Sequence, residues 1–100
     1  MTQSKWVRVG SVRRFDEVKP DKAQALKVLE EAAEVVEAWK RMDKAADSPT
    51  WRKRYFELLD ECADVIQATL NLVAALGVED FRPYMKACEE RNRERGRITK

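Results

Sequence analysis

Apolar residues recur every three or four positions from residue 22 to residue 42. The residues that form this stripe are Leu26, Leu29, Ala33, Val36 and Trp39. Such spacing places them on one face and predicts an amphipathic helix. Pro20 suits the first turn of this helix, and Asp21 lies next to it, near the positive end of the helix dipole. We therefore expect a first helix from about residue 20 to Met42.

Residues 58–76 are apolar almost all round. The polar residues of this region form one narrow stripe at steps of three and four: Glu57, Glu61, Asp64, Gln67 and Asn71. Because a helix that is apolar on every side is normally buried, we expect this segment in the core. Ser48 and Pro49 are typical of an N-cap and a first helical position, and Gly77 is typical of a helix end. The second predicted helix therefore runs from Ser48 to Leu76.

A shorter third helix is expected between Asp80, as its cap, and Gly96, as its end. Pro83 falls early enough in this helix to be tolerated. Its apolar side is formed by Phe81, Tyr84, Met85 and Cys88. By contrast, residues 1–18 show no helical period. The brief alternation Val7-Arg8-Val9 predicts an extended arm or an edge strand there.

These elements divide the chain into an N-terminal arm (1–18), a helical domain (19–97) and a short tail (98–100). The predicted fold class is all-α, as an antiparallel helical bundle. Three helices cannot surround a middle helix as apolar as residues 58–76. We therefore expect a homodimer or a homotetramer, in which another copy completes the core.

The composition argues against several classes of function. With 100 residues, 44% hydrophobic and 38% charged, the chain is typical of one folded helical domain. The net charge of +2 is too small to indicate nucleic-acid binding. No signal core and no apolar run long enough to span a bilayer are present, so we expect a cytoplasmic protein that does not bind membranes. The absence of histidine argues against zinc, haem and the common di-iron sites.

Four carboxylates carry the candidate chemistry. Glu31 and Glu34 lie three residues apart on the first helix, and Glu61 and Asp64 lie three apart on the second. This spacing puts each pair on one helical face. Buried carboxylates must be paired, neutralised or bound to a metal, and oxygen ligands of this kind suit Mg²⁺, with Mn²⁺ as an alternative. A solvated helix face is the other interpretation, and it fits poorly for Glu61 and Asp64 because their neighbours are apolar.

The third helix carries candidate phosphate ligands. Arg91 and Arg95 lie four residues apart on one face, with Asn92 beside them. A planar guanidinium group suits phosphate oxygens. Because three glutamates alternate with these arginines, a solvated charged helix end is the competing interpretation.

Two further residues are candidates for substrate binding. Lys27 precedes Glu31 by four residues, so it either neutralises the acids or reaches the substrate. Asn71 follows Asp64 by seven residues on the same polar stripe, in an otherwise apolar helix. Its amide needs hydrogen-bond partners, which a base edge, a ribose hydroxyl or a neighbouring subunit could supply.

The acidic motifs resemble a known signature. Glu30-Glu31-Ala32-Ala33-Glu34 is followed by Glu61-Cys62-Ala63-Asp64, which is similar to the Glu-Glu-x-x-Glu and Glu-x-x-Asp pattern of the MazG-like all-α nucleotide pyrophosphohydrolases. This superfamily includes dimeric dUTPases, dCTP pyrophosphatases and phosphoribosyl-ATP pyrophosphohydrolases. The resemblance covers about residues 20–97, and residues 90–96 resemble the tails of small phage-type and bacterial members.

The resemblance implies an activity. It implies that Glu31, Glu34, Glu61 and Asp64 bind Mg²⁺, and that a metal-activated water attacks between the α- and β-phosphates. The products are then a nucleoside monophosphate and pyrophosphate. It also places Arg91 and Arg95 where such proteins often have phosphate-binding residues.

The substrate is best predicted as a nucleoside triphosphate, (d)NTP. Phosphoribosyl-ATP is the alternative substrate, and two features place it second. The stretch between the motifs, residues 40–60, is longer than we expect for the phosphoribosyl-ATP branch, and the usual N-terminal helix of that branch is missing. A non-enzymatic helical module, whose basic tails grip an acidic partner or nucleic acid, is a third hypothesis.

Overall fold

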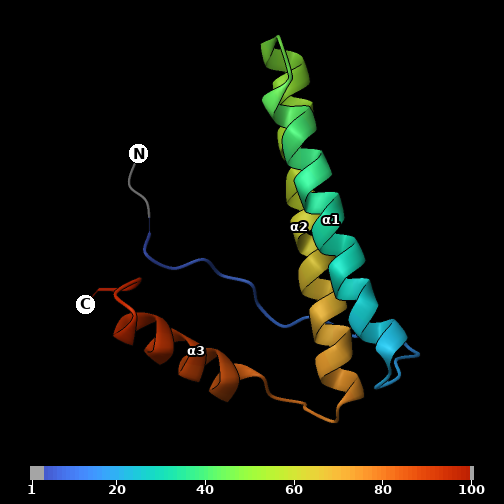
Figure 1. The fold of residues 1–100 in the computed structure, drawn as a ribbon, viewed down its shortest axis with the longest axis vertical. Coiled ribbons are helices and arrows are strands. Elements are labelled where there is room, and N and C mark those ends of the chain that lie inside the picture. Colours follow the sequence, from blue (N-terminus) through green and yellow to red (C-terminus); the bar gives the residue numbers. More distant parts are fainter. Residues whose placement is uncertain (1–3, 100) are drawn as a thin grey trace.

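The protein is described by a computed structural model of residues 4–99. Residues 1–3 of the predicted arm and Lys100 of the predicted tail lie outside the described residues. The described chain contains three helices and no strand (Figure 1): α1 (Lys22–Asp43), α2 (Ser48–Ala75) and α3 (Arg82–Glu94). The all-α prediction is confirmed. Residues 4–20 form neither helix nor strand, so the arm is extended and not an edge strand.

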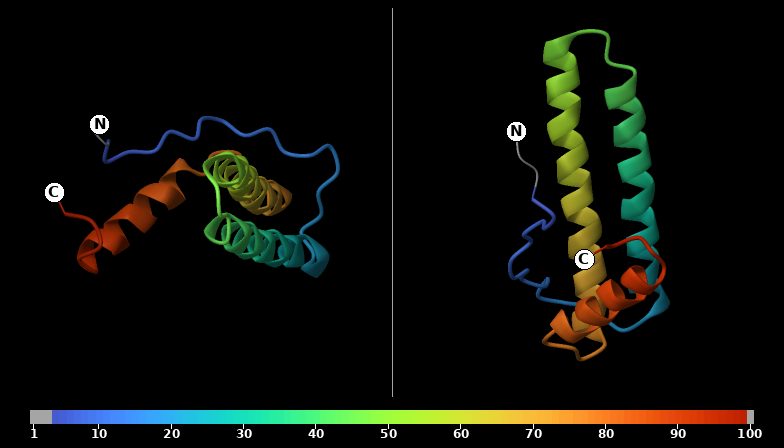
Figure 2. Two further views of the ribbon diagram at one scale, coloured as in Figure 1. Left: turned by 90° about the horizontal axis from the view of Figure 1, so that it is seen from above. Right: turned by 90° about the vertical axis from the view of Figure 1, so that its left-hand side faces the viewer.

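α1 and α2 form a long antiparallel hairpin, and the two helices lie side by side in every view (Figures 1 and 2). Asp21 caps α1 by accepting the backbone N–H of Gln24 at 2.9 Å. Asp47 caps α2, one residue before the predicted cap Ser48, which is the first residue of the helix. The reason is that the Asp47 carboxylate accepts both the backbone N–H of Thr50 at 2.8 Å and its hydroxyl at 3.0 Å.

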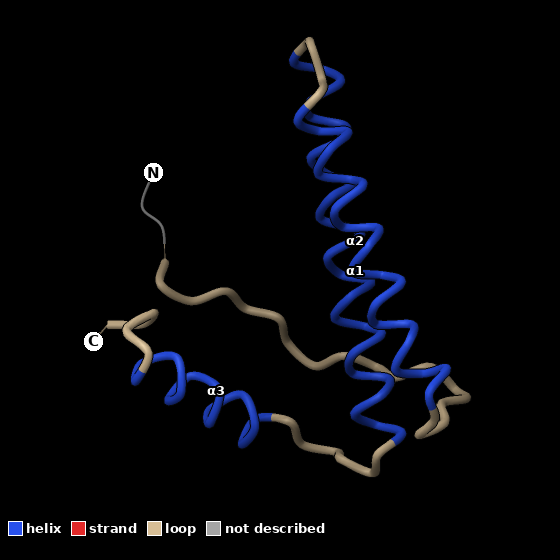
Figure 3. The backbone as a smooth tube through the Cα atoms, in the orientation of Figure 1, coloured by secondary structure: helices blue, strands red, loops and turns tan. Residues whose placement is uncertain are grey.

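α3 stands apart from the hairpin, as the tube drawing makes clear (Figure 3). Among the described residues, α1 and α2 are the one pair of helices in contact. The predicted cap Asp80 accepts the backbone N–H of Arg82 at 3.1 Å, although the N-cap position itself is Phe81. The radius of gyration is 16.2 Å, whereas about 13 Å is typical of a compact domain of this size. One chain therefore does not close a three-helix bundle.

Within a single chain, residues 58–76 are only partly covered, so the predicted burial of this segment is not reached without another copy. The buried residues of the described chain are Ala38, Ala68 and Asn71. Leu59 and Ile66 of α2 are 47% and 40% exposed. The physical reason is that one neighbouring helix and one extended arm cover only part of the circumference of α2. Much of its apolar surface is left uncovered.

None of the described helices is both long enough and apolar enough to cross a bilayer. One backbone constraint of the fold lies at the end of α2. There Gly77 adopts φ +86°, in the left-handed region, and an added Cβ would meet no atom within 4 Å. A side chain at this position is therefore opposed by the backbone conformation and not by lack of space.

Gly77→Ala is expected to lower the free energy of unfolding by about 1 kcal/mol, because alanine is disfavoured at positive φ. Urea denaturation followed by circular dichroism measures the change. The matched control is Gly10→Ala, at φ +79° in the non-helical arm, which should change the unfolding of the helices less. Equal stability of Gly77→Ala and the wild type would contradict this account of the turn.

Candidate metal centre

Three carboxylates meet across the seam between α1 and α2. Glu31 comes from α1, and Glu61 and Asp64 come from α2. One carboxylate oxygen of each residue lies within 4.8 Å of the other two. Glu61 and Asp64 share one face of α2 because they are three residues apart. The antiparallel register of the hairpin brings Glu31 opposite them. The predicted convergence of the two motifs is therefore seen for three of the four acids.

The cluster is electrostatically unfavourable by itself. Desolvation raises the pKa of Glu61, and the negative charges of Asp64, Glu34 and Glu31 raise it further, while Arg41 lowers it. Glu34 is exposed and lies outside the close group, but it remains within electrostatic reach. None of the ion pairs found between described side chains involves these four acids.

The degree of burial differs from the sequence prediction. Glu31 and Glu61 are half-buried and Asp64 is exposed, so these acids do not lie in a closed apolar core. The reason is that the seam of an isolated hairpin is open to solvent along its edges. Water can therefore reach the cluster, and a cation held there would keep water ligands.

The donor set fits a hard divalent cation. All three groups offer carboxylate oxygens, which Mg²⁺ and Mn²⁺ prefer. Octahedral Mg²⁺ holds neighbouring oxygens roughly 3 Å apart and opposite ones roughly 4 Å apart. Separations of up to 4.8 Å therefore need only small side-chain rotations to reach this geometry. Glu34 lies outside this close group, so its predicted role as a ligand remains a prediction.

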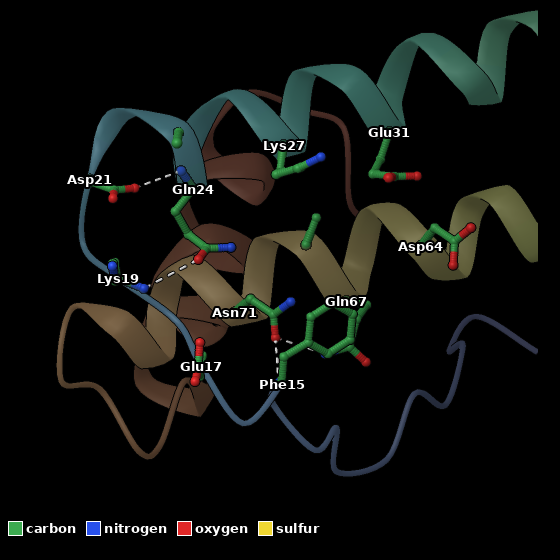
Figure 4. Close-up of a pocket in the computed structure, with 12 residues that line it drawn as sticks. Phe15, Glu17, Lys19, Asp21, Gln24, Lys27, Glu31, Asp64, Gln67 and Asn71 are labelled. Carbon is green, nitrogen blue, oxygen red and sulfur yellow. Dashed lines mark hydrogen bonds between the residues drawn. The ribbon is translucent and has the colours of Figure 1, made fainter.

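A pocket of about 500 Å³ adjoins the cluster (Figure 4). Its walls come from the N-terminal arm, the first turns of α1 and the second half of α2. Glu31 and Asp64 lie at one end of it, and the predicted substrate residues Lys27 and Asn71 also line it. Lys27 forms an ion pair with Glu30 at 3.1 Å and forms none with Glu31. The other lining residues are Phe15, Glu17, Lys19, Asp21, Ala23, Gln24, Gln67 and Ala68.

Asn71 finds its partners within the same chain. Its side chain is 2% exposed, and its Oδ1 accepts the backbone N–H of Phe15 and the Nε2–H of Gln67, both at 3.0 Å. Gln67 Nε2 also donates to the carbonyl oxygen of Arg13 at 3.0 Å. The sequence predicts a ligand or a neighbouring subunit in this role, whereas the structure places the N-terminal arm there. Gln67 was visible on the polar stripe, whereas no sequence signal pointed to Phe15.

The predicted ligands on α3 are not brought to the cluster within one chain. Arg91 and Arg95 are exposed, and α3 contacts neither α1 nor α2. The side chain of Asn92 is engaged within its own segment, donating to the carbonyl oxygen of Cys88 at 2.9 Å and accepting from Arg97 at 3.1 Å. A role for these α3 residues at the cluster remains a prediction that requires a second copy of the chain.

Glu61→Gln is expected to raise the melting temperature at pH 7 in the presence of EDTA. A carboxyl group whose pKa is higher in the folded chain than in the unfolded chain binds protons more tightly when folded, so its ionised form destabilises the fold. This loss of stability is absent below the ordinary pKa of 4.5, and it develops as the pH rises from there through the raised pKa of Glu61 in the folded chain. The gain from the substitution should therefore disappear near pH 4.

Thermal unfolding at both pH values, followed by circular dichroism, tests this. Glu57→Gln is the matched control, because Glu57 lies on the same stripe but is paired with Arg54 at 2.9 Å, so its removal should give no gain. Added Mg²⁺ should stabilise the wild type more than Glu61→Gln. A lower melting temperature for Glu61→Gln in EDTA would show that this carboxylate is not under electrostatic strain.

Comparison with known proteins agrees with this geometry. The model of the phosphoribosyl-ATP pyrophosphohydrolase family matches residues 13–92. No curated protein and no solved structure matches the chain. The family match spans both acidic motifs and begins inside the arm, earlier than the resemblance described from the motifs. The chain therefore belongs to the phosphoribosyl-ATP pyrophosphohydrolase family and is an enzyme that hydrolyses phosphoric anhydrides of nucleotides.

Proposed function

We propose that this protein hydrolyses phosphoribosyl-ATP between its α- and β-phosphates with Mg²⁺ as cofactor, releasing phosphoribosyl-AMP and pyrophosphate. The observation that carries the proposal is the meeting of Glu31, Glu61 and Asp64 beside a pocket, in a chain that belongs to this family. The sequence motifs alone favour a (d)NTP over phosphoribosyl-ATP. The family match supports the reverse order.

The long stretch between the motifs does not argue against phosphoribosyl-ATP. Residues 40–60 form the end of α1, the turn and the first part of α2. The residues that line the pocket come instead from 15–31 and 64–71. Extra length in this stretch therefore extends the hairpin away from the pocket and leaves the walls of the pocket unchanged.

Each residue of the site has a definable task. The carboxylates of Glu31, Glu61 and Asp64 would hold the cation, with Glu34 beside them. When bound, the cation supplies neutralisation of phosphate charge and a lower pKa for an attacking water. Lys27 lies on the pocket wall next to Glu31 (Figure 4), where its ammonium group can contact a phosphate oxygen. Its ion pair with Glu30 is exposed, so exchanging that pair for a phosphate costs little.

Asp64→Asn is expected to reduce kcat/KM by at least about 100-fold, because charge stabilisation by a bound metal contributes several kcal/mol to such reactions. The measurement is pyrophosphate release with Mg²⁺ from phosphoribosyl-ATP, ATP, dUTP and dCTP. Glu37→Gln is the control, since Glu37 is exposed on α1 and paired with Lys40. Activity that survives EDTA would refute the metal-dependent mechanism. A higher kcat/KM for a dNTP than for phosphoribosyl-ATP would contradict the proposed substrate and favour the (d)NTP that the sequence motifs predict.

We also propose that the enzyme is a homo-oligomer. An apolar groove of about 440 Å³ lies on the hairpin, lined by Val35, Val36, Trp39, Leu58, Leu59 and Cys62. Tyr84 and Met85 on α3 are also exposed, and α3 has no packing partner among the described helices. Exposed apolar surface of this extent is typical of a protein interface. A second copy could cover the groove and receive α3, which would bring Arg91 and Arg95 to a site.

Light scattering after size exclusion is expected to give two or four times the chain mass of 11.6 kDa. Trp39→Asp should shift the protein towards the monomer, because it puts a charge into the apolar groove. Val7→Asp is the control, since Val7 is 89% exposed on the arm. A mass of one chain for the wild type at micromolar concentration would contradict the proposal.

A further inference from the structure

We infer that the N-terminal arm is part of the substrate site, and that residues 13–19 form the wall that binds the nucleoside half of the nucleotide. The inference rests on the proposed function for the position of the phosphates. Its other support comes from three features of the described chain: how the arm is held, where it lies relative to the acids, and which groups it presents to the pocket.

The arm is held on α2 by a clamp of two amide side chains. Gln67 and Asn71 are four residues apart and so share one face of α2. Gln67 donates to the carbonyl oxygen of Arg13, and Asn71 accepts the N–H of Phe15, two residues further along the arm. The two amides are also bonded to each other at 3.0 Å. Because Asn71 is almost fully buried, loss of the arm would remove a partner from a buried acceptor.

The distance between the clamp and the acid cluster suits the length of a nucleotide. Asp64, Gln67 and Asn71 follow one another along α2, and the seven residues from Asp64 to Asn71 span about 10 Å. The pocket runs from Glu31 and Asp64 to this clamp. Its volume of about 500 Å³ is within the range of small-molecule sites. With the phosphates at the acids, the sugar and base of a nucleotide extend towards the arm.

The groups at this end of the pocket suit a nucleoside. Phe15 is 60% exposed, and its ring lies at the pocket (Figure 4). An exposed aromatic ring of this kind offers a stacking surface for a base. Phe15 therefore presents an apolar face to the pocket, between the acids Glu31 and Asp64 at one end and the charged residues of the arm at the other.

Asn71 offers a hydrogen-bond donor to the same space. None of the hydrogen bonds found for residues 4–99 uses its Nδ2, and every fully enclosed side-chain polar atom in that range has a partner. The Nδ2 group is therefore not completely enclosed, although Asn71 as a whole is 2% exposed, and Figure 4 shows it pointing away from Phe15. It can donate to a ring nitrogen or carbonyl of a base, or to a ribose hydroxyl. Clamping the arm thus also orients this amide for the ligand.

Steady-state kinetics of Phe15→Ala test the inference. We expect the KM for the best nucleotide substrate to rise about 5- to 20-fold from lost stacking, with kcat within about twofold of the wild type. Phe15→Trp should restore most of the KM, because it keeps a planar ring. Trp6→Ala is the matched control, an exposed aromatic residue of the same arm that does not line the pocket. An unchanged KM in Phe15→Ala would overturn the inference.

A binding measurement on the wild type makes the test independent of turnover. AMP, titrated to millimolar concentration in EDTA, should shift the NMR signals of the Phe15 amide and the Asn71 side-chain amide, and should leave the Trp6 amide unmoved. Such shifts in a protein that hydrolyses no nucleotide would support the arm site and refute the proposed function. An active enzyme with no shift at Phe15 or Asn71 would refute the arm site and leave the proposed function standing.

Discussion

The repulsion between carboxylates on the two sides of the α1–α2 seam is the constraint on which the site depends. Glu31 faces Glu61 and Asp64 without a cationic partner among the described side chains, and partial desolvation raises the pKa of Glu61. A sequence selected for helical packing alone would place apolar residues there. Keeping like charges together lowers the stability of the fold. A cation bound by the three carboxylates would offset this repulsion.

The same seam also explains where a substrate fits. Glu31 and Asp64 lie at one end of the pocket, and Phe15, Gln67 and Asn71 line the part next to them. Charged side chains of the arm and of the start of α1 line the remainder, namely Glu17, Lys19 and Asp21. The arm forms one wall of this pocket, and the match to the family begins at residue 13, where the clamped part of the arm begins.

A single chain leaves apolar surface exposed on both the hairpin and α3. One hairpin leaves part of the apolar surface of α2 exposed, including Leu59 and Ile66, and α3 extends away from it with its own exposed apolar residues. The hydrophobic effect therefore favours association with another chain. Association would act on the groove around Trp39, which is separate from the residues that line the pocket.

The sequence by itself determined the three helices, their boundaries to within a few residues and the acidic motifs on them, because caps, turns and i,i+3 spacing are local properties. It also determined the reaction class through the two motifs. Only the tertiary structure decided that Glu31 meets Glu61 and Asp64 while Glu34 stays outside the close group. The exposed flanks of α2, the separate α3 and the bond between Phe15 and Asn71 were likewise decided there. Local spacing establishes which side chains share a helical face, whereas the partner of that face depends on contacts between residues far apart in the chain, such as the 56 positions between Phe15 and Asn71.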